Sequence, residues 1–166
     1  MRQLRCVLED LGYTSVATYI QSGNVLFESK RKTTATLSAT IEAALAAEFA
    51  RTFSVFVLTA EQLARVMTNA PPGFGADPAR YRYDVVFVKP PMRAPLILPT
   101  LSLKDEVDQA FERNDVLYFS RLIARASQSH LPKLTGHPAY SSMTVRNWKT
   151  TTELCRLISS GSEPIG

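Results

Sequence analysis

The chain has 166 residues, of which 45% are hydrophobic and 20% are charged, and its formal net charge is +4. This length suits one domain or two small subdomains, and the composition is that of a globular protein rather than a disordered or fibrous one. Its apolar runs fall far short of the ~20 residues of a membrane helix, and the N-terminus lacks the apolar region of a signal peptide. We therefore expect a cytoplasmic protein that does not interact with membranes.

The first half of the chain is predicted to contain three helices and three strands. Apolar residues between 4 and 11 recur at the spacing of one face of an amphipathic helix. Ser22-Gly23 separates two β-rich runs, and glycine supplies the positive φ that a tight hairpin turn needs. Thr59 and Gln62 have the spacing of a capping box. In chain order, we expect a helix over 1–11, strands over 15–21 and 24–28, a helix over 34–50, a strand over 53–58 and a helix over 59–69.

A segment rich in proline and glycine follows, and we interpret it as a linker over 71–82. The second half then repeats a similar order of helices and strands. Thr150 and Glu153 again have capping-box spacing, which predicts that the last helix begins there. We expect subdomains over 1–70 and 83–158, and a frayed tail over 159–166. The predicted elements are a strand over 83–89, a short helix within 90–102, strands over 106–112 and 115–120, a helix over 122–134, a strand over 142–146 and a helix that ends near 158.

The order of these elements predicts an α+β fold. The second half has the order βαββαβ, which is typical of a ferredoxin-like unit. The first half has the same order without its opening strand. The sequence therefore predicts two ferredoxin-like (βαββαβ) halves in tandem, the first of which lacks its opening strand.

Two segments carry a resemblance to a known family. The first reads Thr-Tyr-Ile-Gln-Ser-Gly-Asn-Val over 18–25, and the second reads Met-Thr-Val-Arg-Asn-Trp-Lys-Thr over 143–150. Together they resemble the uncharacterised bacterial family known as domain of unknown function 1697, over nearly the whole chain and at matching spacing. The resemblance implies a duplicated α+β fold of this kind. It implies no established reaction, substrate or cofactor.

The chain departs from this resemblance at its start. Members of the family typically begin with a strand and an Arg-Gly-Ile-Asn-like loop, whereas Met1 lies where their first helix begins. A start site placed too far downstream, a truncated gene and a rearranged sheet would each account for the difference.

The sequence contains no recognisable catalytic, metal or cofactor signature. It has no phosphate-binding glycine-rich loop and no nucleophile elbow. Cys6 and Cys155 are isolated, and we interpret both as reduced thiols in helices. No carboxylate lies near His130 or His137 in the sequence to orient them, so both are interpreted as surface or loop residues. We therefore predict no cofactor, and the sequence does not decide whether the protein is an enzyme.

Positive charge is concentrated in one part of the chain, because no Asp or Glu occurs from Val116 to Thr152. A segment of one sign in a mixed background is a mild signal for anion binding. Residues at the predicted hairpin turn and at the start of the last helix are further candidates, since we expect both segments to expose backbone N–H groups. The candidate ligand-binding residues are Ser22, Gly23, Asn24, Arg121, Arg125, Lys133, Arg146, Asn147, Trp148 and Lys149.

Two interpretations of these candidates remain open. Trp148 either stacks on a ligand ring or anchors the core, and Asn147 either contacts a ligand or only caps the helix. The first hypothesis for function is a non-catalytic protein that binds nucleic acid or a phosphorylated metabolite. The alternatives are an enzyme with a small-molecule pocket between the halves, and a homodimer or partner-binding module that docks through the incompletely paired first sheet.

Overall fold

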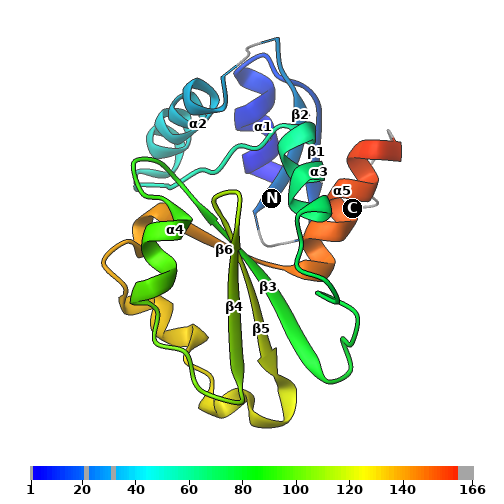
Figure 1. Cartoon of the computed structure of the whole chain (residues 1–166). Helices are drawn as coiled ribbons and strands as arrows, with labels where there is room; N and C mark the ends of the chain where they lie inside the picture. Colours follow the sequence, from blue (N-terminus) through cyan, green and yellow to red (C-terminus); the bar gives the residue numbers. More distant parts are fainter. Residues whose placement is uncertain (1, 21–22, 31–32, 161–166) are drawn as a thin grey trace. The chain divides into compact units, whose positions relative to one another are not determined.

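The computed structural model describes residues 2–20, 23–30 and 33–160, and it shows a mixed α/β protein with two antiparallel sheets (Figure 1). The chain divides into two compact units, one of Met1–Gln62 with Leu154–Gly166 and one of Leu63–Glu153. The division falls within α3 (Ala60–Thr68) and within α5 (Trp148–Ser160). The expected linker over 71–82 therefore belongs to the second unit, and the end of the last helix belongs to the first.

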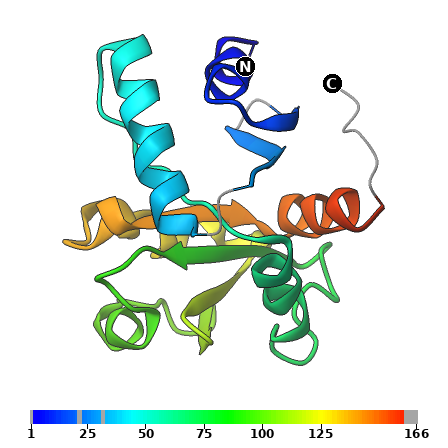
Figure 2. The same ribbon diagram turned by 90° about the horizontal axis from the view of Figure 1, so that it is seen from above.

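The first unit combines a β-hairpin with two helices. Its elements are α1 (Arg2–Asp10), β1 (Thr14–Tyr19), β2 (Asn24–Glu28) and α2 (Thr34–Phe49). The two strands pair antiparallel, and Gly23 at the turn has a φ of 75°. Figures 1 and 2 show α1 beside α2. The buried residues of this core are Val7, Leu8, Tyr13, Val16, Leu37, Ile41 and Leu45.

The prediction of a strand over 53–58 is wrong, because the described structure has no strand there. Phe53, Val55 and Val57 do pack against the first core, which explains the alternation seen in the sequence. A strand also needs a neighbour with which to exchange backbone hydrogen bonds. The Val55 N–H instead donates to Glu42 Oε1 at 2.8 Å. The alternation therefore reflects packing and not sheet formation.

The second unit is built on a four-stranded antiparallel sheet. Its strands are β3 (Tyr81–Val88), β4 (Asp108–Arg113), β5 (Val116–Leu122) and β6 (Met143–Asn147), and their order in the sheet is β4-β5-β3-β6. The predicted β4–β5 hairpin is confirmed. Asn114 and Asp115 form its turn with φ values of 52° and 62°, and these residue types tolerate positive φ well.

The two faces of this sheet are covered differently. On one face, α4 (Ala94–Ile97) and the 3₁₀ helix η3 (Leu131–Gly136) pack over Phe119 and its neighbours. Figures 1 and 2 show α4 alongside the sheet. Tyr118 points to the other face because successive side chains of a strand alternate. There its ring lies 5.3 Å from that of Phe74 and 6.4 Å from that of Trp148.

The expected helix over 122–134 is replaced by two 3₁₀ helices, η2 (Ile123–Gln128) and η3, so that prediction is wrong. Proline lacks a backbone N–H and is tolerated in the first turn of a helix rather than in its interior. Pro132 accordingly lies in the first turn of η3. Two further short 3₁₀ helices are η1 (Leu98–Thr100) and η4 (Tyr140–Ser142).

The two predicted capping boxes have different outcomes. The first is confirmed, since the Gln62 N–H donates to Thr59 Oγ1 at 3.1 Å and the Thr59 N–H donates to Gln62 Oε1 at 2.8 Å. The second, at Thr150, is wrong because α5 already begins at Trp148. Asn147 caps that helix, and its Oδ1 accepts from the Lys149 N–H at 3.0 Å.

The last helix continues through Ser160, and residues 161–166 of the expected tail lie outside the described residues. Across the described ranges, no helix is both long enough and apolar enough to cross a bilayer.

Candidate functional site

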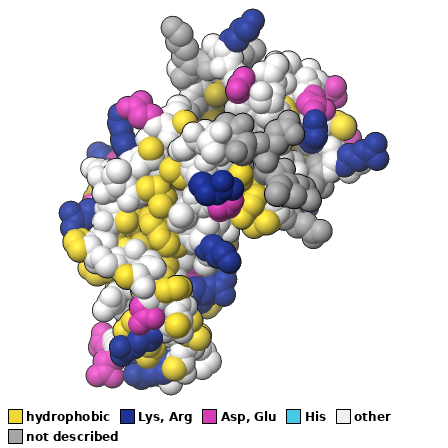
Figure 3. Space-filling model, turned by 90° about the vertical axis from the view of Figure 1, so that its right-hand side faces the viewer, with side chains coloured by type: hydrophobic (Ala, Val, Ile, Leu, Met, Phe, Trp, Pro, Cys, Tyr) yellow, Lys and Arg dark blue, Asp and Glu magenta, His cyan; other side chains and the backbone are white. Residues whose placement is uncertain are grey.

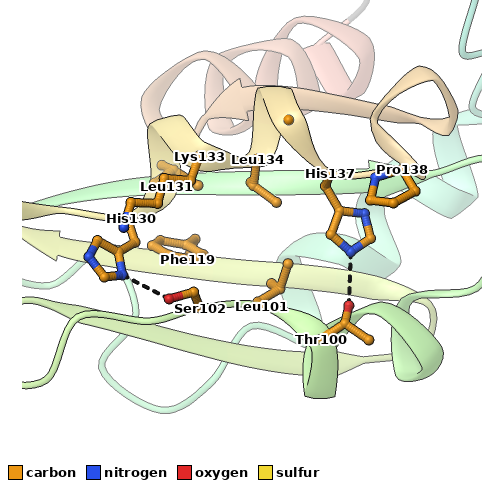
Figure 4. A pocket seen from close by; sticks show the side chains of 11 residues that line it. Thr100, Leu101, Ser102, Phe119, His130, Leu131, Lys133, Leu134, His137 and Pro138 are labelled. Atoms are coloured by element: carbon orange, nitrogen blue, oxygen red, sulfur yellow. Dashed lines mark hydrogen bonds between the residues drawn. The ribbon is translucent and has the colours of Figure 1, made fainter.

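The second unit contains a pocket of 260 Å³ that is lined by both histidines of the chain (Figure 4). One wall is formed by residues 100–102, which end η1 and follow it. The opposite wall is η3 with the residues on either side of it, and Phe119 of β5 also lines the pocket. His130 directly precedes η3 and His137 directly follows it, so the two rings lie at opposite ends of the pocket. We call this the two-histidine pocket.

At one end, His130 pairs with a serine hydroxyl. Its Nδ1 lies 3.0 Å from Ser102 Oγ, and either atom can be the donor because both tautomers of a neutral imidazole are available. The other ring nitrogen, Nε2, has no hydrogen-bond partner among the described residues. Figure 4 shows this second nitrogen on the side of the ring away from the other lining residues, so the Ser102 hydroxyl is the polar group that this end of the pocket offers to a ligand.

At the other end, the bonding pattern fixes the tautomer of His137. The Thr100 hydroxyl has one proton and donates it to Ile97 O at 2.6 Å, so it accepts from His137 Nε2 at 2.9 Å. The Ala139 N–H donates to His137 Nδ1 at 3.1 Å. One nitrogen therefore donates, the other accepts, and both already have protein partners.

Between these ends the pocket has an apolar lining and one cation. Figure 4 shows Leu131, Leu134 and Phe119 between the two rings. These three side chains are almost completely buried. Lys133 also lines the pocket, and its side chain makes no ion pair with the described residues. The lining thus combines an apolar surface with a positive charge.

A buried carboxylate positions the His130 end. Asp108, at the start of β4, is 6% exposed, and its Oδ2 accepts from the His130 N–H at 2.7 Å and from the Lys104 N–H at 3.0 Å. Lys104 lies two residues beyond Ser102. Asp108 therefore connects the two chain segments that carry the Ser102–His130 pair.

A second buried carboxylate lies in the same sheet. Asp84 is 4% exposed, and its Oδ2 lies 3.9 Å from both Arg82 Nε and Arg121 Nη2. Burial raises the pKa of the Asp84 carboxyl, and this effect exceeds the opposing effects of the two guanidinium groups and of the Asn147 amide. Arg121 is used in this pairing, and its buried Nε has no hydrogen-bond partner among the described residues.

The predicted residues of the hairpin turn belong to the first unit and are not among the residues that line the two-histidine pocket. Ser22 lies outside the described residues. Gly23 forms the turn, and Asn24 is 8% exposed and directs its amide to Tyr19 O at 3.5 Å.

The predicted arginines of the second unit are each bonded within the protein. Arg125 bonds to Glu106 at 3.3 Å and to Gln128 at 3.0 Å. Arg146 donates to Thr144 Oγ1 at 2.8 Å and to Val145 O at 2.9 Å, and burial lowers its pKa. Of the five cationic candidates, the pocket includes Lys133.

The segment at the start of α5 has structural contacts. The Asn147 amide donates to Tyr83 O at 3.2 Å, in addition to its role as the helix cap. The Trp148 ring lies edge-on to Phe74 at 5.0 Å, and Lys149 is exposed. These contacts favour the structural interpretation of Asn147 and Trp148. Ligand binding by this segment stays a prediction.

Sequence reasoning missed four residues of the pocket: Thr100, Ser102, His130 and His137. Roughly thirty residues separate the two hydroxyls from the two rings, and no motif links them. The histidines flank Leu131-Pro132-Lys133-Leu134, a short apolar and basic run in the acid-free segment, which was the one signal available.

The chemistry of the pocket suits binding better than catalysis or metal coordination. A serine within 3.2 Å of a histidine is the geometry of a nucleophile and its base, but such a base is usually oriented by a third group. Here the nearby Asp108 carboxylate bonds to the backbone N–H of His130 and not to its ring. The described residues contain no group of three or more His, Cys, Asp or Glu side chains that could hold a metal ion.

Comparisons with known proteins agree with the fold and name no activity. Residues 1–118 match the family described as "Protein of unknown function (DUF1697)". The structure is similar to that of the conserved bacterial protein SP0830 from Streptococcus pneumoniae, with a TM-score of 0.80 and 25% sequence identity over 95% of this chain and 88% of that chain. No curated protein matches the chain. Because the family match extends over well more than half of the sequence, the chain belongs to the DUF1697 family of proteins of unknown function.

Proposed function

We propose that the protein is a non-catalytic binding protein that holds a small organic anion in the two-histidine pocket. The observation that carries this proposal is the combination of the Ser102–His130 pair, Lys133 and an apolar lining in one concave site. A hydroxyl and an ammonium group stabilise an anion, and the leucine and phenylalanine side chains favour an apolar body.

The size of the pocket supports a small ligand. Pockets that bind drug-sized ligands have volumes of about 300–1,000 Å³, and this pocket has a volume of 260 Å³. A carboxylate or a phosphate monoester with a short hydrocarbon part fits this scale.

The charge distribution supports a small anion over a nucleic acid. Nucleic-acid binding relies on several cationic side chains that are available to phosphates along one surface. Arg121, Arg125 and Arg146 are already bonded or partly buried in the protein. On the face seen in Figure 3, Lys and Arg side chains are dispersed among Asp and Glu side chains.

The strand order β4-β5-β3-β6 supports a ferredoxin-like arrangement for the second unit, because β3, the first strand of that unit, is an inner strand of the sheet. A tandem of two such halves, a cytoplasmic location and a homodimer stay predictions.

Isothermal titration calorimetry with hexanoate, hexyl phosphate and hexanamide tests the proposed function. Hexanamide has the shape of hexanoate without its charge. We expect saturable binding of at least one anion with a Kd in the roughly micromolar to millimolar range, as is usual for ligands of this size, and at least tenfold weaker binding of hexanamide. The two anions distinguish a carboxylate from a phosphate ligand.

Two results would contradict the proposed function. Equal affinity for hexanoate and hexanamide would show that charge is not recognised. Binding of a single-stranded oligonucleotide with a steep dependence on salt, without binding of either small anion, would favour a nucleic-acid ligand instead.

A further inference from the structure

The two ends of the two-histidine pocket differ in their capacity to bind a charged group. We infer that the ligand is a small molecule with a single anionic group and an apolar tail. The anionic group lies at the His130 end, and the tail extends toward the His137 end. This inference rests on the proposed function and specifies its ligand class and orientation.

The His137 end has no imidazole nitrogen to offer. Thr100 accepts from Nε2 at 2.9 Å, and Ala139 donates to Nδ1 at 3.1 Å. The Thr100 hydroxyl proton is itself donated to Ile97 O at 2.6 Å. An anion could gain a hydrogen bond from this histidine only if one of these bonds broke, and a broken bond leaves a polar group unsatisfied.

The His130 end has hydrogen-bond donors that are available to an anion. When the His130 Nδ1–H donates to Ser102 Oγ, the Ser102 hydroxyl proton is free to donate to an anion, because it has no other partner among the described residues. Lys133, three residues further along the chain, lines the same wall of the pocket. Asp108 holds the His130 backbone by a bond of 2.7 Å, so the ring is attached to a fixed part of the sheet.

The space between the two ends is apolar. Leu131, Leu134 and Phe119 lie between the rings (Figure 4). At the rise of roughly 2 Å per residue of a 3₁₀ helix, the seven steps from residue 130 to 137 span roughly 14 Å. A short ligand therefore cannot bond to both rings at once. A second charge on its tail would be removed from water beside leucine side chains without a new partner.

A series of carboxylates measured by titration calorimetry on the wild-type chain tests this inference without any variant. The series comprises butanoate, hexanoate, octanoate and octanedioate, the last of which has the length of octanoate and a carboxylate at each end. We expect affinity to rise roughly two- to fourfold for each added methylene until the tail no longer fits. We expect octanedioate to bind at least tenfold more weakly than octanoate.

Two variants test the orientation. His130→Asn removes the imidazole of the open end, and His137→Asn makes the same change at the closed end. We expect His130→Asn to weaken octanoate binding at least tenfold, and His137→Asn to weaken it by a clearly smaller factor. Circular dichroism and the melting temperature show whether each variant is folded.

The failure of this inference can be distinguished from the failure of the proposed function. If no carboxylate or alkyl phosphate binds the wild-type chain, both are wrong. If hexanoate binds in preference to hexanamide but octanedioate binds as tightly as octanoate, the proposed function stands and the single-headed ligand class is wrong. A larger loss in His137→Asn than in His130→Asn, in folded proteins, reverses the orientation and overturns the inference.

Discussion

His130 and His137 show how the immediate partners of a residue decide its chemistry. Both rings contact a hydroxyl group, at 3.0 and 2.9 Å. Only His137 also accepts from a backbone N–H, that of Ala139, and this contact removes its second nitrogen from ligand binding.

Gly75 allows the Trp148 ring to pack against the backbone. The residue has a φ of 84°, and a Cβ atom at this position would overlap the Trp148 ring. Gly73 has a similar φ of 77°, but a Cβ there would meet no atom within 4 Å. The pair therefore separates the effect of backbone conformation from the effect of the tryptophan.

We predict that Gly73→Ala lowers the free energy of unfolding by about 1–2 kcal/mol through its left-handed backbone alone. Gly75→Ala carries the same cost and adds about 1–3 kcal/mol for the displaced ring. Urea unfolding followed by circular dichroism measures both values. Equal losses in the two variants would show that the Trp148 contact does not constrain Gly75.

The position of η3 depends on groups outside the helix itself. A helix of six residues has few internal hydrogen bonds, so groups around it determine its position. Asp108 accepts from the N–H of His130 just before η3, and the Ser129 hydroxyl accepts from the Leu131 N–H at 3.2 Å. We therefore regard Asp108 as a positioning residue for the pocket.

We predict that Asp108→Asn lowers the free energy of unfolding by about 1–3 kcal/mol, because a charged acceptor of two backbone bonds becomes a neutral one. It also weakens hexanoate binding, since His130 is held less firmly. Asp105→Asn is the matched control: it makes the same change at an exposed residue three positions earlier, and we expect an effect within about 0.5 kcal/mol. Similar losses in the two variants would contradict the positioning role.

The elements also show how far the sequence could predict this structure. The β4–β5 hairpin was predictable because the strands expected over 106–112 and 115–120 flank a short polar turn, which the structure places at Asn114-Asp115. The absence of a strand over 53–58 was not predictable, because alternation does not reveal whether a neighbouring strand is present. The prediction of one helix over the η2–η3 region is wrong because hydrophobic spacing does not distinguish two 3₁₀ helices from one α-helix. The pocket could not be predicted, since it depends on η1 lying opposite η3, a contact between segments roughly thirty residues apart.

At the scale of the whole molecule, the candidate site belongs to one unit. Every residue that lines the two-histidine pocket lies within Leu63–Glu153. Trp148 belongs to the same unit but packs against Tyr118, on the opposite face of the sheet from Phe119. The NMR signal of Trp148 therefore serves as an internal control, because we expect a ligand bound in the pocket to leave it unchanged.

A titration with octanoate, followed by ¹H–¹³C NMR spectra of the histidine rings, the leucine methyl groups and the Trp148 indole, tests the central claim most directly. The chain contains two histidines, and His130→Asn and His137→Asn assign their signals. We predict that the His130 ring and the methyl groups of Leu131 and Leu134 shift saturably with one common Kd while the Trp148 signal stays constant. Saturable shifts of Trp148 with unchanged histidine signals would place the ligand elsewhere and contradict the account.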